Sequence, residues 1–209
     1  MPSLDTLLAL LAGYLIGSLP FGYWVARARG VDILKEGSGN PGATNVKRVV
    51  GPAAGNIVFI LDFLKGVLAV SWVRVLPAAA EEAWIVLSIL GLVGAILGHS
   101  FSLFLRFRGG KGVATTVGGM VTLMPVATLI AILVWLLIFF LTRYVSLASI
   151  GLAVALPIAR LLSGGVDLLF GFAALLSLFV IFRHRGNIRR LLAGQEHRFE
   201  RRRPEGQSS

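Results

Sequence analysis

Long apolar runs, separated by short polar segments, dominate the chain. A transmembrane α-helix needs about 20 mainly apolar residues, and runs of this length recur from end to end. The pattern therefore predicts an all-α, polytopic integral membrane protein. Within the first run we expect Gly13, Gly17 and Pro20 to break the helix. The runs are Leu4–Ala26, Ala53–Leu76, Trp84–Leu105, Val113–Leu141, Val145–Leu162 and Val166–Phe182.

The run Val113–Leu141 is longer than one crossing requires and contains Met124–Pro125. Proline ends or kinks a helix at the preceding residue, so this run is either one kinked span or two short ones. If it crosses twice, nearly all arginines and lysines outside the spans lie on one side. If it crosses once, the arginine-rich tail and the basic segment 106–111 lie on opposite sides, against the positive-inside rule. We therefore predict seven spans, some short or broken, with the N-terminus outside and the C-terminus cytoplasmic.

Composition and charge narrow the function classes. The 209 residues are 56% hydrophobic and 14% charged, whereas a soluble domain is about 25% charged. The net charge of +10 first reports orientation in a membrane protein, so we expect no nucleic-acid partner. The absence of cysteine excludes disulfides, a thiol nucleophile and a Cys-ligated metal. One domain is expected over residues 1–209, with 201–209 as a disordered tail.

The segment from Gly37 to Arg48 reads Gly-Ser-Gly-Asn-Pro-Gly-Ala-Thr-Asn-Val-Lys-Arg. Glycines allow positive φ and close backbone approach, and converging amides beside cations bind oxyanions such as phosphate. The spacing G-x-G-x-x-G does not indicate a dinucleotide fold here, because no strand precedes it. A membrane-loop turn without a ligand is the alternative.

A second glycine-rich segment, Gly109-Gly-Lys-Gly112, precedes an apolar run. It does not match the P-loop pattern, which has Ser or Thr directly after the lysine. Free amides at a helix N-terminus beside an ammonium still favour phosphate binding. Flanking charge of the positive-inside kind would explain Arg106 and Arg108 but not the three glycines.

Other polar side chains lie near the ends of the last two runs. Ser146 and Ser149 are three apart and share a helical face, where helix packing is the alternative. His184 and Asn187 are also three apart; an imidazole can accept a proton from an alcohol, and an amide can donate to a developing oxyanion.

Several polar residues lie inside the apolar runs, among them Asp62, Lys65 and His99. Asp62 and Lys65 are predicted to form an ion pair on one helix face, with a structural role. His99 is expected to be a hydrogen-bonded structural residue. No H-x-x-x-x-D box of acyltransferases, no G-x-S-x-G elbow and no metal-ligand cluster occurs in the sequence.

The ordered set of motifs resembles the bacterial acyl-phosphate:glycerol-3-phosphate acyltransferases, the PlsY family, over nearly the whole chain. A small departure is Ser102-Leu103 after Phe101, where the family pattern has a proline. The matching segments are Gly17–Gly22, Gly37–Asn45 with Arg48, Gly98-His99 with Gly109–Thr115, Ser146–Ser149, and His184–Arg190 through Glu196.

The resemblance implies a seven-helix membrane enzyme that transfers a fatty acyl group from acyl-phosphate to glycerol-3-phosphate. The products would be 1-acyl-glycerol-3-phosphate and inorganic phosphate, the first step of phospholipid synthesis, on the cytoplasmic face of the bacterial inner membrane. Neither a metal nor another cofactor is implied; the partners are the two substrates and membrane lipid. Oligomeric state and acyl-chain preference stay open, and a monomer is compatible with the sequence.

Under that chemistry the two glycine-rich turns and the cations would hold two phosphates side by side, and His184 would be the base or would only orient the acceptor. The candidate catalytic residues are Ser38, Arg48, Lys111, His184 and Asn187. The candidate substrate-binding residues are Gly37, Gly39, Asn40, Thr44, Asn45, Gly110, Gly112, Thr115, Ser146, Ser149 and Glu196.

Two other classes fit parts of the sequence. A transporter of a phosphorylated metabolite predicts internal repeats and polar groups at the bilayer midplane; we find no repeat, and Asp62 with Lys65 is the one such pair. A non-catalytic scaffold attracted to anionic lipid needs positive charge but not Ser-, Gly- and Asn-rich turns.

Overall fold

The computed structural model describes residues 4–76 and 81–199, and all regular secondary structure in those ranges is helical. The tail predicted over residues 201–209 lies outside them. The α-helices are α1 (Leu4–Ser18), α2 (Phe21–Arg27), α3 (Ala43–Val49), α4 (Pro52–Ser71), α5 (Glu81–Ser100), α6 (Val113–Leu123), α7 (Pro125–Thr142), α8 (Val145–Gly164), α9 (Leu168–Arg183) and α10 (Arg185–Leu192), with 3-10 turns η1 (Trp72–Val75) and η2 (Leu103–Leu105).

The lengths of the apolar helices confirm an all-α integral membrane protein. Five stretches of the described chain are long and apolar enough to cross a bilayer, and α9 with α10, bent by 59°, makes up to six. Helix α6 is also apolar but shorter. The seven-span count and the orientation therefore stay predictions.

The proline at the middle of the fourth run has the expected effect. Helix α6 ends at Leu123 and α7 begins at Pro125, where the missing N–H of proline costs no helical bond. Between them Met124 has φ −144° and ψ 73°, outside the helical region. The prediction of a break at Met124–Pro125 is confirmed.

The prediction that Gly13 and Gly17 break the first run is wrong. Helix α1 continues through both glycines, and the break falls at Leu19–Pro20. A Cβ at Gly13 or Gly17 would lie 2.1 or 2.0 Å from a backbone oxygen of α5. The glycines therefore serve close helix packing, as small residues do in membranes.

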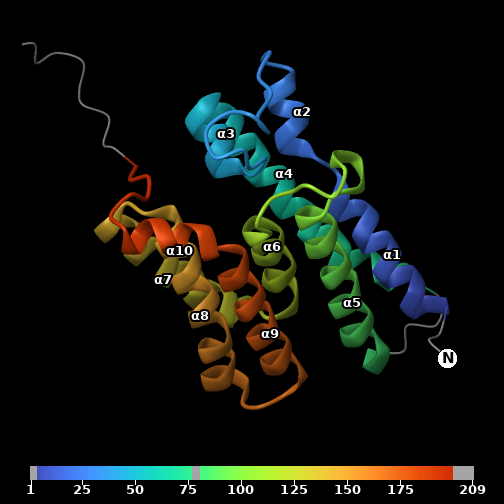
Figure 1. The fold of residues 1–209 in the computed structure, drawn as a ribbon. Helices are drawn as coiled ribbons and strands as arrows, with labels where there is room; N and C mark the ends of the chain where they lie inside the picture. The colour runs from blue at the N-terminus through green and yellow to red at the C-terminus, as the bar shows by residue number, and fades with distance from the viewer. Residues whose placement is uncertain (1–3, 77–80, 200–209) are drawn as a thin grey trace, which may run out of the picture.

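The helices form two groups (Figure 1). The N-terminal group comprises α1 to α6, in which α1 packs on α5 and α4 packs on α6. The C-terminal group comprises α7 to α10, in which α8 packs on both α7 and α9. One apolar core that includes Leu92, Met120, Leu152 and Phe172 joins the two groups.

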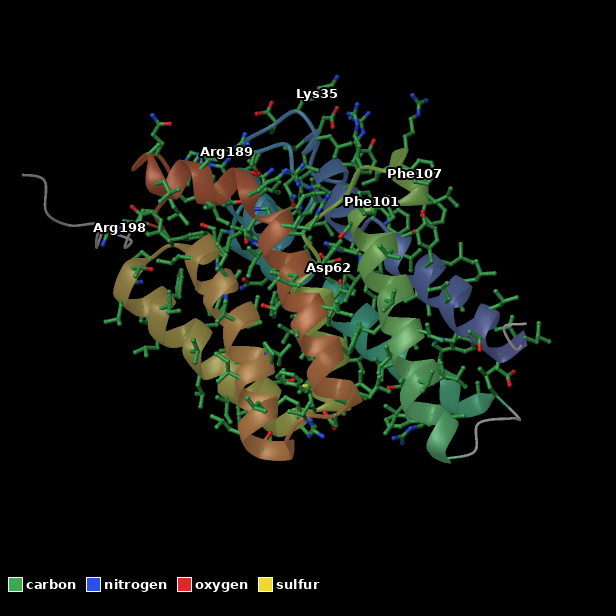
Figure 2. All side chains as sticks on the ribbon, turned by 60° about the horizontal axis from the view of Figure 1, so that its bottom comes forward. Lys35, Asp62, Phe101, Phe107, Arg189 and Arg198 are labelled. Atoms are coloured by element: carbon green, nitrogen blue, oxygen red, sulfur yellow. The ribbon has the colours of Figure 1, made fainter. Side chains whose placement is uncertain are left out.

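Three short helices gather at one end of the long ones. In Figure 1, α2, α3 and α10 lie opposite the end at which the chain begins. Figure 2 shows Lys35 and Arg189, from segments far apart in sequence, at this same end, whereas Asp62 lies deeper among the helices. The polar motifs of the sequence therefore share one end of the bundle.

Candidate active site

A hydrogen-bonded network connects the second glycine-rich turn with the C-terminal helices. Lys111 Nζ donates to Asn187 Oδ1 (2.5 Å), and Asn187 Nδ2 donates to Glu196 Oε1 (2.7 Å). The Ser146 hydroxyl donates to the same carboxylate oxygen (2.9 Å), and Arg190 Nε donates to Oε2 (2.7 Å). We call Lys111, Ser146, Asn187, Arg190 and Glu196 the Lys111–Glu196 network. It joins the α5–α6 turn, the start of α8, and α10 with the turn that follows it.

The turn 109–112 leads directly into α6. Gly112 has φ 80° and is the residue at the N-terminal cap of α6. The Gly110 N–H donates to His99 O (3.0 Å), and Arg183 donates to Gly110 O (2.7 Å). The first N–H groups of a helix have no partner within the helix and carry its positive dipole end, so this end of α6 can receive an anion beside the Lys111 ammonium.

The first glycine-rich turn is shaped by its own asparagines. Gly37 and Gly39 have φ 59° and 68°. Asn45 Oδ1 accepts from the Ser38 N–H (3.0 Å), and Asn45 Nδ2 donates to Glu36 O (3.0 Å). Asn40 Oδ1 accepts from the N–H of the glycine two residues later (2.8 Å). These amides hold the backbone in place, and within residues 4–76 and 81–199 the Ser38 hydroxyl has no hydrogen-bond partner.

Arg48 on α3 connects this turn electrostatically to the network. Its charge interacts with Glu196, Arg190 and Lys111. Burial is the largest cause that lowers the pKa of Lys111; with Glu196 opposing it and Arg190, Arg183 and Arg48 adding to it, the pKa falls to about 8. The neighbourhood of Lys111 thus holds more positive charge than one carboxylate neutralises.

Glu196 is held in its charged form. Burial alone would raise the pKa of its carboxyl, but hydrogen bonds from Asn187, Ser146 and Arg190 outweigh burial and lower that pKa. A charged Glu196 can accept from three donors at once. It therefore orients Asn187 and Ser146 by accepting their hydrogen bonds. The Lys111 ammonium donates to Asn187 and remains close to the positive charges of the nearby arginines.

His184 lies at the junction of α9 and α10 and is 3% exposed. Its Nδ1 lies 2.8 Å from Val180 O. Since a carbonyl oxygen only accepts, Nδ1 carries the hydrogen, and Nε2 is the acceptor. Burial, followed by the Lys111 charge, lowers the pKa of His184 to about 4. Such an imidazole is neutral at pH 7 and suits accepting a hydrogen bond better than retaining a proton.

The remaining predicted side chains form no hydrogen bond to the network in the described part of the chain. Ser149 Oγ donates to Val145 O (2.8 Å) and accepts from Trp135 Nε1 (3.4 Å). Thr115 is fully buried on α6, and its hydroxyl has no hydrogen-bond partner in the described part of the chain. Across residues 4–76 and 81–199, no hydrogen bond joins the side chains of Ser38 or Thr44 to the Lys111–Glu196 network.

Sequence reasoning did not include Arg183 and Arg190 among the site residues. Arg190 lies three residues after Asn187, and this spacing places both on one face of α10. That spacing was the available signal. Arg183 had none beyond its place before His184, because its contact with Gly110 O joins residues 73 positions apart.

An apolar cavity of about 10 Å³ lies between α6, α8 and α9. One of its walls is formed by Val180, the residue whose carbonyl accepts from His184. Another is formed by Val113, the first residue of α6. The lining residues are Val113, Thr116, Leu152, Ala153, Leu156, Leu176, Ser177 and Val180.

Comparisons with known proteins agree on one family. Residues 7–194 match the family model described as glycerol-3-phosphate acyltransferase. The chain is 47% identical over 201 residues to the glycerol-3-phosphate acyltransferase 1 of Deinococcus radiodurans, covering 94% of this chain and 96% of the relative. It is 43% identical over 197 residues to the glycerol-3-phosphate acyltransferase of Aquifex aeolicus, covering 94% of this chain and all of the relative.

Solved structures of PlsY, an integral membrane glycerol 3-phosphate acyltransferase, have the same fold. The glycerol 3-phosphate form matches with a TM-score of 0.85 at 40% identity, covering 93% of this chain and 96% of that one. The lysophosphatidic acid form matches with a TM-score of 0.82 at 40% identity, covering 93% and 95%.

Proposed function

The chain belongs to the glycerol-3-phosphate acyltransferase family, and from that premise we propose that it transfers a fatty acyl group from acyl-phosphate to glycerol-3-phosphate. The products are 1-acyl-glycerol-3-phosphate (lysophosphatidic acid) and inorganic phosphate. The observation that carries this proposal is the surplus of positive charge around Lys111, at the meeting point of a glycine-rich turn, a helix N-terminus and an apolar cavity.

The choice of acyl-phosphate as donor follows from the charge and the groups available. Both substrates carry a phosphate, and two anions close together in a site of low dielectric repel strongly. Lys111, Arg48, Arg183 and Arg190 supply more cations than Glu196 neutralises, which supports binding of two phosphates. An acyl-phosphate is a mixed anhydride and is already activated, so the transfer requires no covalent enzyme intermediate.

The reaction is a direct displacement at the acyl carbon. The glycerol hydroxyl oxygen forms a bond to the carbonyl carbon, and the bond from that carbon to the phosphate oxygen breaks. The phosphate leaves with the electron pair, and the hydroxyl proton passes to a base. Lys111, together with the free amides at the N-terminus of α6, stabilises the charge that develops on the leaving phosphate.

We assign orientation of the acceptor to His184 and Asn187. The unprotonated Nε2 of His184 accepts a hydrogen bond from the attacking hydroxyl, and Asn187, held by Glu196, lies beside the Lys111 ammonium. The low pKa of His184 favours a substrate phosphate as the final proton acceptor. Ser38, Thr44 and Ser146 bind phosphate or glycerol oxygens, and Glu196 fixes the network.

We propose that the acyl chain of the donor lies against the apolar helices α6, α8 and α9, which would have to part to admit it, since the cavity that they enclose measures only about 10 Å³. Its leucine- and valine-rich lining begins beside Val113 at the glycine turn and Val180 below His184. A chain bound there would have its carbonyl near Lys111 and its tail among apolar helices. Access would be sideways from the bilayer, since the acyl chain is already dissolved there.

The location follows from charge. By the positive-inside rule, the end that carries α2, α3 and α10 faces the cytoplasm, in the inner membrane of a bacterium. Glycerol-3-phosphate is water-soluble and would reach Arg48 and Lys111 directly from that side. We propose that residues 1–209 form one domain that acts on its two substrates without a cofactor or a metal.

One assay tests the proposal. Purified protein in lipid nanodiscs is incubated with acyl-phosphate and glycerol-3-phosphate, and inorganic phosphate and lysophosphatidic acid are measured. We expect equimolar release of both, and no product when acyl-coenzyme A replaces acyl-phosphate. A transporter or a lipid-binding scaffold would release no phosphate above the rate of spontaneous hydrolysis, and that outcome would refute the proposal.

A further inference from the structure

A charged cluster is buried inside the bundle, apart from the Lys111–Glu196 network. Asp62 and Lys65 on α4 are 3% and 4% exposed, and Lys65 Nζ lies 2.9 Å from Asp62 Oδ1. His99 on α5 is oriented toward the same carboxylate, with Nδ1 3.5 Å from Asp62 Oδ1. Figure 2 shows Asp62 deep among the helices, below Phe101 at the end of α5. We call Asp62, Lys65 and His99 the buried cluster.

Lys65 connects the buried cluster to the break between α1 and α2. Its Nζ also donates to Gly17 O (2.9 Å) and Leu19 O (3.2 Å). These carbonyls lie at the C-terminal end of α1, where helical partners are missing. An ammonium has three donors, and with Asp62 all three have acceptors. The ion pair therefore fixes α4 against the end of α1.

His99 carries this rigidity to the second glycine-rich turn. A Cβ at Gly110 would lie 2.0 Å from His99 Nε2, so the imidazole packs directly on the backbone of the turn. The Gly110 N–H donates to His99 O (3.0 Å), and a Cβ at Gly109 would lie 2.1 Å from the same carbonyl oxygen. Arg183 donates to Gly110 O (2.7 Å). His99 and Arg183 thus both hold Gly110, one residue before Lys111.

The packing of His99 on Gly110 does more than stabilise the fold, because it restricts the backbone of a glycine-rich turn. A turn of Gly109, Gly110 and Gly112 has no side chains of its own to fix it, and glycine has the greatest backbone freedom. A small displacement of a binding group can cost about 100-fold in rate. The carboxylate of Asp62 fixes the orientation of the His99 imidazole, and the imidazole fixes the position of the turn by packing against it.

We propose that Asp62, Lys65 and His99 are positioning residues that hold the Gly109–Gly112 turn, and with it Lys111, in the geometry that binds a substrate phosphate. A small cavity joins the two sites: its lining includes all three residues of the buried cluster as well as Gly109 and Gly110. The kinetic part of this inference rests on the proposed function.

The test compares variants of the cluster with a matched control. H99A removes the imidazole, and D62L/K65M replaces the ion pair by apolar groups of similar size. S88A is the control, because Ser88 is fully buried and donates to Val70 O (3.2 Å) between the same two helices, away from the turn. Each protein in nanodiscs is assayed for the KM and kcat of glycerol-3-phosphate transfer, and for hydrogen exchange of the peptide spanning residues 106–114.

We expect H99A and D62L/K65M to raise the KM for glycerol-3-phosphate about tenfold or more, which corresponds to lost binding rather than lost folded protein. We also expect faster exchange in the 106–114 peptide, because without the fixed imidazole packed on it the turn moves more, and the hydrogen bond from the Gly110 N–H to His99 O opens more often. S88A should change neither the KM nor the exchange. The clash in G110A should likewise raise the KM, and H99A/G110A should reverse part of that increase by removing the ring.

Wild-type KM and wild-type exchange in both H99A and D62L/K65M would overturn the inference. If H99A does not fold, D62L/K65M decides, since it preserves side-chain bulk and leaves no unpaired charge. If the wild-type protein forms no lysophosphatidic acid, the proposed function fails, but the exchange comparison still decides whether the cluster holds the turn.

Discussion

The chain contains two clusters built around a lysine, and they differ in how completely the lysine is paired. In the buried cluster, the three donors of Lys65 have the acceptors Asp62 Oδ1, Gly17 O and Leu19 O. In the Lys111–Glu196 network, Lys111 donates to the side-chain oxygen of Asn187, and Glu196, the one carboxylate of this network in the described part of the chain, accepts from Arg190. The first cluster balances its charge within the protein, and the second does not.

This difference separates structure from binding. A charge buried in an apolar bundle is costly unless it is paired, so the full pairing of Lys65 is what folding requires. The surplus around Lys111 is tolerated because it lies at the end of the bundle, and burial with three arginines lowers its pKa to about 8. An anionic ligand would relieve that surplus, and so we propose that a lysine stabilises the fold in the buried cluster and binds substrate in the Lys111–Glu196 network.

The largest effect is expected from K111A. Without the ammonium, only backbone N–H groups and more distant arginines would stabilise the phosphate as it departs, so kcat/KM should fall by roughly 10²–10³. The rate of phosphate release per folded protein, with folding checked by size exclusion and thermal unfolding, measures this. Wild-type turnover from folded K111A would remove Lys111 from the site.

R48A should have the next largest effect. Arg48 lies on α3 and interacts with Glu196 and Lys111, so its loss should lower kcat/KM by at least about tenfold. K47A is the matched control: Lys47 is exposed and its Nζ lies 3.5 Å from Asn56 Oδ1. Equal activities of R48A and K47A would place Arg48 outside the site.

D62N should act on stability in the way that the fully paired cluster predicts. It leaves Lys65 buried without its counter-charge, which costs about 3–5 kcal/mol, and the temperature of unfolding should fall clearly. D62L/K65M should recover most of that loss, because it removes both charges together. A double variant no more stable than D62N would contradict the pairing argument.

The pH dependence of kcat/KM should report the charge on Lys111. Lys111 is charged below its pKa of about 8 and neutral above it, so affinity for an anionic substrate is present at low pH and lost as pH rises through 8. In the free enzyme kcat/KM should therefore fall above pH 8, by up to about tenfold per unit. In K111R, whose guanidinium stays charged, this decline should move to higher pH.

R160A should have the smallest effect. Arg160 pairs with Asp167 between α8 and α9 at the far end of the bundle, with Nε 3.2 Å from Oδ1. Both side chains are partly exposed to solvent, so the pair is worth at most about 1 kcal/mol. The unfolding temperature and the turnover should stay close to those of the wild type. A large loss of activity would show that the Arg160–Asp167 pair affects the active site despite its distance from it.

Some features of the fold followed from sequence because they depend on neighbours along the chain. Apolar run length predicted the membrane helices, and Pro125 predicted the break between α6 and α7. The spacing of Asp62 and Lys65 predicted their ion pair, since residues three apart share a helix face. Gly13 and Gly17 were misjudged because local flexibility was weighed without the helix that packs on them.

The sequence by itself determined that this is a membrane protein with glycine-rich and basic segments suited to phosphate, and the order of those segments indicated its family. Only the tertiary structure decided that Asn40 and Asn45 bond to their own turn, that Lys111 donates to Asn187, and that Arg183 reaches Gly110. Those contacts join residues far apart in the chain, or depend on which donors the backbone leaves free. Helix periodicity relates only residues a few positions apart, and composition only counts residue types, so neither of them predicts these contacts.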